Sequence, residues 1–239
     1  MKKFPLFVFS LLIVTFSFAQ EKVINDPNAE VRKVSSFQAI KVSHGIDLII
    51  TQSTKEAVAV SATEKEFRDR IITEVENGVL KISYDIDKWW KNVSTPKKLQ
   101  AYVSFINIDK IEGTSGSQIS VENELHGKSL EVELSSGASM KGNVKVSNLS
   151  IEQSSGASST ISGEADSLRV ETSSGAIFHG YDLISEKCEA DASSGGSIHI
   201  TVDKDLSAEA SSGGGIRYKG AGVISKVSAT SGGSVKKNG

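Results

Sequence analysis

The chain has almost no cysteine, proline or tryptophan. Its 239 residues include one Cys, three Pro and two Trp. A single cysteine excludes an intramolecular disulfide, and the scarcity of proline leaves no proline-rich linker between domains. The four histidines form no His-Glu-x-x-His or Cys-His arrangement. We therefore expect one domain without a disulfide, a resident metal or a cofactor.

The sequence also lacks a strong charge excess of either sign, with 27 Lys and Arg against 29 Asp and Glu. Cleavage of the N-terminal signal described next would leave 25 basic and 29 acidic side chains. A slightly acidic chain is a poor fit to nucleic acid or to an anionic membrane. We expect neither as a partner.

The first 19 residues have the pattern of an export signal. Lys2 and Lys3 precede an apolar run over 4–18, which is too short for a comfortable membrane span, and Ala19 ends a small-x-small cleavage site. We expect a signal peptide over 1–19, a leader over 20–30 and one domain over 31–239. The mature chain is expected in the periplasm, at the cell surface or outside the cell, with no membrane insertion.

A short repeat dominates the second half of the chain. Thr-Ser-Gly or Ser-Ser-Gly recurs every 18 to 21 residues, with its glycines at Gly116, Gly137, Gly156, Gly175, Gly195, Gly213 and Gly232. A period this short and regular is typical of one coil of a stacked solenoid. Nineteen residues are too few for a strand–helix–strand crossover. The sequence predicts an all-β, parallel β-helix with coils of about 19 residues, and we favour the commoner right hand.

Alignment on the glycines gives apolar columns that alternate with polar ones, which indicates strands with one buried face. The inward columns stand seven, five and three residues before each glycine and three after it, as at Leu130, Val132, Leu134 and Met140. The one cysteine, Cys188, occupies such a column, so we interpret it as a core residue. Glycine readily adopts positive φ, so Ser-Ser-Gly is predicted to form the corner between two strands.

Residues 31–110 are strand-like but lack the repeat, so they are predicted to form irregular early coils and a cap, followed by regular coils over 111–239. Asn77-Gly78 has the composition of a hairpin turn.

The order of motifs resembles a known family. The motifs are Phe37-x-x-Ile40-x-Val42-x-x-Gly45-Ile46-x-Leu48-x-Ile50-x-Gln52, then Glu74-Val75-x-Asn77-Gly78-x-Leu80-x-Ile82, then the Ser-Gly corners. Together they resemble the putative auto-transporter adhesin head GIN domain family, found mostly in Bacteroidetes. The resemblance covers about residues 31–235. It implies a secreted or envelope β-helix whose adhesin label is an analogy from fold.

Two outward columns carry charge. The acidic column, four residues before each glycine, contains Glu133, Glu152, Glu171, Asp191 and Glu209. The basic-leaning column, four residues after, contains Lys141, Thr160, His179, His199, Arg217 and Lys236. In register, the acids would form a ladder that is either a solvated stripe, which we favour, or a cation-binding surface. His179 and His199 would lie about 5 Å apart, and we interpret them as surface residues rather than a metal pair.

No catalytic motif is present, and the uniform repeat length leaves little room for loops that would build a groove. The adjacent Trp89 and Trp90 are the candidate ligand-binding residues, as an aromatic platform for sugar or a partner protein. The alternative is that one covers the core and the other covers a coil edge.

We therefore predict a non-catalytic, adhesin-like module that is secreted or located in the envelope. Its role would be structural or binding, with a glycan or an envelope protein as partner. The alternative is a carbohydrate-active enzyme, a polysaccharide lyase or hydrolase, that uses Glu152, Glu171 and Arg169.

Overall fold

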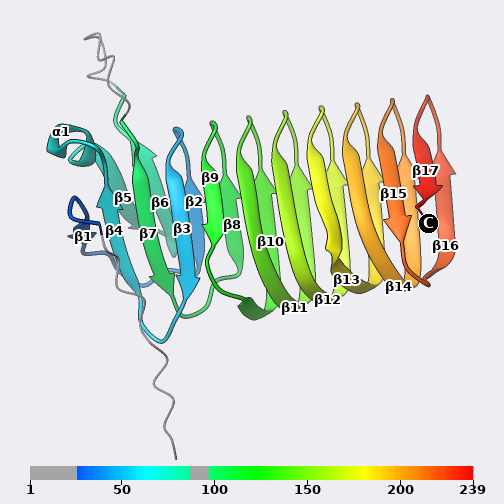
Figure 1. The fold of residues 1–239 in the computed structure, drawn as a ribbon, viewed down its shortest axis with the longest axis horizontal. Coiled ribbons are helices and arrows are strands. Elements are labelled where there is room, and N and C mark those ends of the chain that lie inside the picture. The colour runs from blue at the N-terminus through cyan, green and yellow to red at the C-terminus, as the bar shows by residue number, and fades with distance from the viewer. Residues whose placement is uncertain (1–25, 87–96, 239) are drawn as a thin grey trace, which may run out of the picture.

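Successive coils of the chain stack in register along one axis (Figure 1). The computed structural model describes residues 26–86 and 97–238. Leu130 pairs with Leu149, and Leu149 with Leu168, which gives a coil of 19 residues and confirms the predicted parallel β-helix. In the part of the chain that is described, no helix has the length and apolarity to cross a bilayer.

Each coil has two main strand segments, one on each side of its Ser-Gly corner. We name the side that leads into the corners face A and the side that leaves them face B. In stacking order, face A contains β6 (Val79–Tyr84), β2 (Ala39–Val42), β8 (Lys110–Gly113), the ends of the long strands and β16 (Val223–Ala229). Face B contains β7 (Gln100–Phe105), β3 (Asp47–Gln52), β9 (Gln118–Val121), the starts of β11–β14, β15 (Gly215–Lys219) and β17 (Ser234–Lys237). The long strands are β10 (Leu125–Leu134), β11 (Ser139–Gln153), β12 (Ser158–Thr172), β13 (Ile177–Ala192) and β14 (Ser197–Ala210).

Antiparallel strands and one short helix cover the N-terminal end of the stack (Figure 1). Strand β4 (Ala57–Ser61) pairs with β7 and with β1 (Glu30–Arg32), while β5 (Ile71–Glu76) pairs with β6 across the Asn77-Gly78 hairpin. Helix α1 (Lys65–Arg68) joins β4 to β5 and buries Phe67. These elements shield the inward columns at this end from water.

The early coils do not stack in the order of the sequence. The coil made by β2 and β3 lies between the coil of β6 and β7 and the coil of β8 and β9, because β2 pairs with both β6 and β8, and β3 with both β7 and β9. The chain therefore passes the β2–β3 layer when it runs from β7 to β8. Residues more than 70 positions apart in the sequence, such as Lys41 and Glu112, become neighbours.

The Ser-Gly corners are two-residue turns in which both central residues have positive φ. The serines have φ of 47–53° and the glycines 71–79°, from Ser115-Gly116 to Ser231-Gly232. Positive φ at both positions defines a type I′ turn, whose twist suits the flanking strands. The sequence predicted positive φ for the glycine alone; the serine also adopts it.

Hydrogen bonds join the corners from coil to coil. The glycine N–H of each corner donates to the serine carbonyl of the next, at 2.9–3.2 Å, from Gly45 to Gly213. The His44-Gly45 turn between β2 and β3 belongs to this ladder, because Gly45 donates to the Ser115 carbonyl. The corners therefore satisfy backbone groups that a thin core would otherwise leave unpaired.

The residue after each corner is held tightly against the preceding coil. After the seven corners from Gly116 to Gly232 it is always small: serine, alanine or glycine. These residues are the buried Ser117, Ala138, Ala157 and Ala176, then Gly196, Gly214 and Gly233. A Cβ at Gly214 would lie 2.1 Å from the Ala192 carbonyl oxygen. The inward column three residues before the corner becomes smaller along the same direction, from Leu134 to Ala192.

The interior is a continuous apolar column that is uncovered at the C-terminal end. Leu168, Phe178 and Cys188 are buried, and burial raises the pKa of the Cys188 thiol to about 12. In β16, Val223 and Val227 are exposed because no later coil covers them in the described chain.

Candidate functional site

The sequence-predicted ligand residues Trp89 and Trp90 lie outside the described residues. The charged columns on the two faces are therefore the features that can be built into a site.

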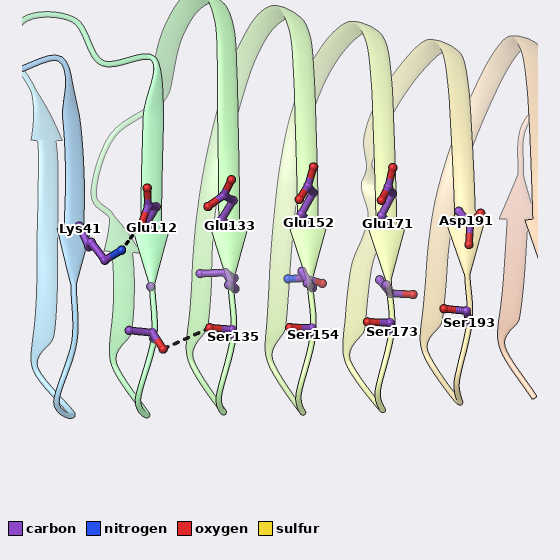
Figure 2. A pocket seen from close by; sticks show the side chains of 15 residues that line it. Lys41, Glu112, Glu133, Ser135, Glu152, Ser154, Glu171, Ser173, Asp191 and Ser193 are labelled. Atoms are coloured by element: carbon purple, nitrogen blue, oxygen red, sulfur yellow. Dashed lines mark hydrogen bonds and ion pairs between the residues drawn. The ribbon is translucent and has the colours of Figure 1, made fainter. Parts of the chain in front are cut away.

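The acidic column forms an in-register ladder on face A. Its members pair strand by strand, and the structure adds a sixth carboxylate, Glu112, which stands four residues before Gly116 and so belongs to the same column. The ladder is Glu112, Glu133, Glu152, Glu171, Asp191 and Glu209. Figure 2 shows the first five of these carboxylates, from Glu112 to Asp191, in one row, with a parallel row of serines nearer the corners: Ser135, Ser154, Ser173 and Ser193. Between the rows runs an open groove of about 440 Å³.

Cations from neighbouring positions neutralise much of the ladder. At its N-terminal end Lys41 pairs with Glu112 at 2.7 Å (Figure 2). Lys110 contacts Glu133 at 2.6 Å and Glu131 at 3.2 Å, and hydrogen bonds to these carboxylates raise the pKa of its ammonium group.

Further along face A, Arg169 pairs with Glu171 and with Glu189, the latter at 2.7 Å, and Lys226 pairs with Glu209. The ladder is therefore a mixed-charge surface with ion pairs at intervals rather than an uninterrupted row of anions.

Two ladder members have no recorded ion pair in the described parts of the chain, Glu152 and Asp191. Partial burial, followed by the charges of Glu171 and Glu209, raises the pKa of the Asp191 carboxyl above its ordinary value. A raised pKa means that the folded state penalises the charged carboxylate.

We expect Asp191→Asn to stabilise the protein at neutral pH. The penalty on the charged carboxylate is present above its raised pKa and is lost as pH falls and the carboxyl becomes protonated. At about 5 Å in water each like-charged neighbour costs roughly 0.8 kcal/mol before screening, so the melting temperature should rise by about 1–3 °C at pH 7. Melting curves at pH 7 and pH 4 measure the difference.

The matched control is Glu209→Gln, which removes a carboxylate of the same ladder that pairs with Lys226. It should give a smaller gain than Asp191→Asn, because the repulsion it removes from Asp191 is offset by the loss of its ion pair with Lys226. An Asp191→Asn protein that gains as much at pH 4 as at pH 7 would contradict a charge-based effect.

The remaining chemistry of the predicted site is limited. Across residues 26–86 and 97–238 no group of three His, Cys, Asp or Glu side chains is arranged to hold a metal ion. His179 and His199 lie near each other as expected, with ring centroids 5.4 Å apart. Of the enzyme candidates, Glu171 and Arg169 are bonded to each other on an open surface, where water is not excluded.

Face B carries a second cluster near the C-terminal end. His179, His199, Arg217 and Lys236 pair in register across β13, β14, β15 and β17. Tyr181 joins them: its ring stacks on that of His199, with centroids 5.0 Å apart and planes 5° apart, and the Lys219 ammonium lies 4.4 Å from its centroid.

The column alignment did not indicate Tyr181 or Lys219. The coil that contains Tyr181 is one residue longer than the standard 19, and the pairing of β13 with β14 shifts register just after Gly180. The sequence did contain one signal: Tyr181 and Lys219 both stand six residues after a corner glycine, Gly175 and Gly213, and so share a column of mixed residue types.

Fold and surface together define a class: an all-β solenoid whose long outer faces carry ordered charge over an apolar column. Within that class the chain belongs to the family described as "Putative auto-transporter adhesin, head GIN domain", whose sequence profile matches residues 36–222. This confirms the family resemblance. No curated protein matches the chain.

Solved structures show the same fold. A protein described as a "putative adhesin" from Bacteroides fragilis superposes with a TM-score of 0.79 at 20% identity, over 88% of this chain and 96% of its own. A "putative adhesin" from Parabacteroides merdae gives 0.69 at 16% identity, over 88% and 95%. A "putative lipid binding protein" from Parabacteroides distasonis gives 0.62 at 19% identity, over 90% and 98%.

Proposed function

We propose that this protein is an exported, non-catalytic binding module that acts as an adhesin-like β-helix. Its family and its adhesin-like neighbours support the adhesin part of this proposal. The binding role is supported by the geometry of the faces. Coils of nearly constant length present flat, charged strands with an open groove. Such faces offer many weak contacts to an extended partner, a glycan or an envelope protein.

The alternative of a polysaccharide lyase or hydrolase is less well supported. Glycosidic chemistry needs two carboxyls in different protonation states, or a base beside a charge-neutralising group, held around a substrate from which water is excluded. On face A the carboxylates recur in an open row, and Arg169 is already shared between two of them.

We expect no turnover of polysaccharides by the mature protein. The mature protein is incubated with neutral and anionic polysaccharides, and the formation of new reducing ends and of ultraviolet-absorbing unsaturated products is measured. The Glu152→Gln/Glu171→Gln variant is the control, since it removes the enzyme candidates and should behave like the wild type. Sustained product formation that disappears in this variant would establish the enzyme instead.

Export is tested separately by expressing the full chain in a Gram-negative host and sequencing the N-terminus of the protein from each cell fraction. The expected product starts at Gln20 and lies outside the cytoplasm. Retention of an uncleaved chain in the cytoplasm would contradict the export part of the proposal.

A further inference from the structure

The face B cluster differs from face A in having cations without carboxylate partners. We name His179, Tyr181, His199, Arg217, Lys219 and Lys236 the cationic patch. Within residues 26–86 and 97–238 no ion pair is recorded for Arg217, Lys219 or Lys236, whereas Lys110, Arg169 and Lys226 on face A are all paired. From residue 211 to 238 the sequence contains no Asp or Glu. The positive charge of this end is therefore available to a ligand.

The patch is also held in place before any ligand arrives. Tyr181 reaches across neighbouring coils, where its ring contacts His199 and Lys219 and its hydroxyl accepts a hydrogen bond of 2.8 Å from the Asn238 side chain. Arg217 lies 3.5 Å from the His199 imidazole. Cation–π and stacking contacts restrict these side chains, which lowers the entropy lost when they bind a partner.

We propose that the cationic patch binds a linear anionic polysaccharide that lies along the stack, across successive coils. This proposal rests on the proposed function and names the ligand class and the face. On face B, the successive strands β14, β15 and β17 present His199, Arg217 and Lys236 in one row, about 4.8 Å apart. A polymer with charges repeated along its length can contact several of them at once.

Other polyanions fit less well. Single-stranded nucleic acid binds an open surface largely by stacking its bases on exposed aromatic rings, and the Tyr181 ring is already in contact with His199 and Lys219. Binding to an anionic membrane is strengthened by apolar side chains that enter the interface, and the outward residues of this row are polar or charged. Polysaccharide carboxylates or sulfates need only the row of cations.

The imidazole of His199 makes this binding sensitive to pH. The titratable and charged groups around His199 on the adjacent strands are His179 and Tyr181 on β13 and Arg217 and Lys219 on β15, and none of them is a carboxylate. Lys236 lies one coil further along, on β17. Burial, then the charges of His179 and Arg217, lowers the pKa of the His199 imidazole. A bound anion favours the protonated ring, so affinity should rise as pH falls from 8 to 5.5.

The test measures binding of the mature protein to dextran sulfate, polygalacturonate and neutral dextran in 50 mM NaCl. The patch variant is Arg217→Ser/Lys219→Ser/Lys236→Ser. The matched control, Lys41→Ser/Lys145→Ser/Lys204→Ser, removes the same charge from ion-paired lysines elsewhere. We expect about a 10-fold or larger loss of affinity for the anionic polymers in the patch variant and less than 2-fold in the control.

Two further variants separate charge from folding and define the pH effect. Arg217→Lys/Lys219→Arg/Lys236→Arg keeps the charges and should restore binding. His179→Gln/His199→Gln should abolish the gain of about 3-fold or more expected between pH 8 and 5.5. Circular dichroism confirms that each variant is folded.

Equal losses in the patch variant and its control, or tighter binding to duplex DNA or phosphatidylglycerol vesicles than to either anionic polysaccharide, would overturn the proposal. Absence of binding to both polysaccharides would also overturn it. The proposed function would be judged separately by the turnover and export assays, which do not depend on this face.

Discussion

Phe178→Ala is expected to destabilise the protein by about 3–5 kcal/mol, which corresponds to a fall of about 10 °C or more in melting temperature. Phe178 is fully buried in the inward column of face B, between Ser159 and Ile198 on the adjacent coils. Its ring packs under the backbone at Gly180, where an added Cβ would lie 2.4 Å from the ring edge. Because the coils on either side are fixed by their own hydrogen bonds, the cavity cannot close by collapse.

Urea denaturation followed by circular dichroism measures the change. The matched control is Ile177→Ala, one residue earlier in β13, because this side chain points outward and is 36% exposed. It should cost less than about 1 kcal/mol. Similar losses at the two positions would contradict the assignment of inward and outward columns.

Gly214→Ala is expected to cost about 3 kcal/mol, or a fall of about 6–12 °C in melting temperature. The added methyl group would lie 2.1 Å from the Ala192 carbonyl oxygen and 2.5 Å from its carbon. Both are backbone atoms of the preceding coil, so no side-chain rotation can relieve the overlap. The corner would have to move away and strain its link to the neighbouring coils.

The neighbouring Gly215→Ala is the control, since the nearest atom to its added methyl group would be the Ser234 hydroxyl at 3.8 Å. There the change should be neutral or slightly stabilising, because alanine restricts the unfolded chain more than glycine does. Equal melting temperatures for the two single variants would show that the close approach of the corners does not limit stability.

The sequence was sufficient for the regular coils because every coil repeats the same local pattern. Leu149 and Leu168 occupy equivalent positions in the sequence and in space, so the period alone places them in contact. The acidic ladder was predictable for the same reason. The positive φ of Ser136 and its equivalents was not, because serine rarely adopts that conformation without the demands of a type I′ turn.

Contacts that depend on chain crossing or irregular coils were not predictable. Lys41 reaches Glu112 because the β2–β3 coil is inserted between later coils, and no periodicity records that insertion. Tyr181 stands six residues after Gly175, in the glycine-aligned column that also contains Lys219 and Asn238. The residue types in this column are mixed, and Tyr181 lies where the strand pairing shifts register, so the sequence alone showed no pattern there. The row of basic residues on face B could therefore be predicted from the sequence. The contacts of Tyr181 with that row could be found only in the three-dimensional structure.

The inserted β2–β3 coil gives the two ends of the molecule different mechanical behaviour. At the C-terminal end each coil contacts only its immediate neighbours. A pulling force applied at the C-terminus would therefore detach these coils one at a time, at low force. A load applied near the N-terminus must instead extract β2 and β3 from between two layers formed later in the chain, and so must break several strand pairings together. A tethered protein of this design would resist pulling best when it is anchored through its first strands.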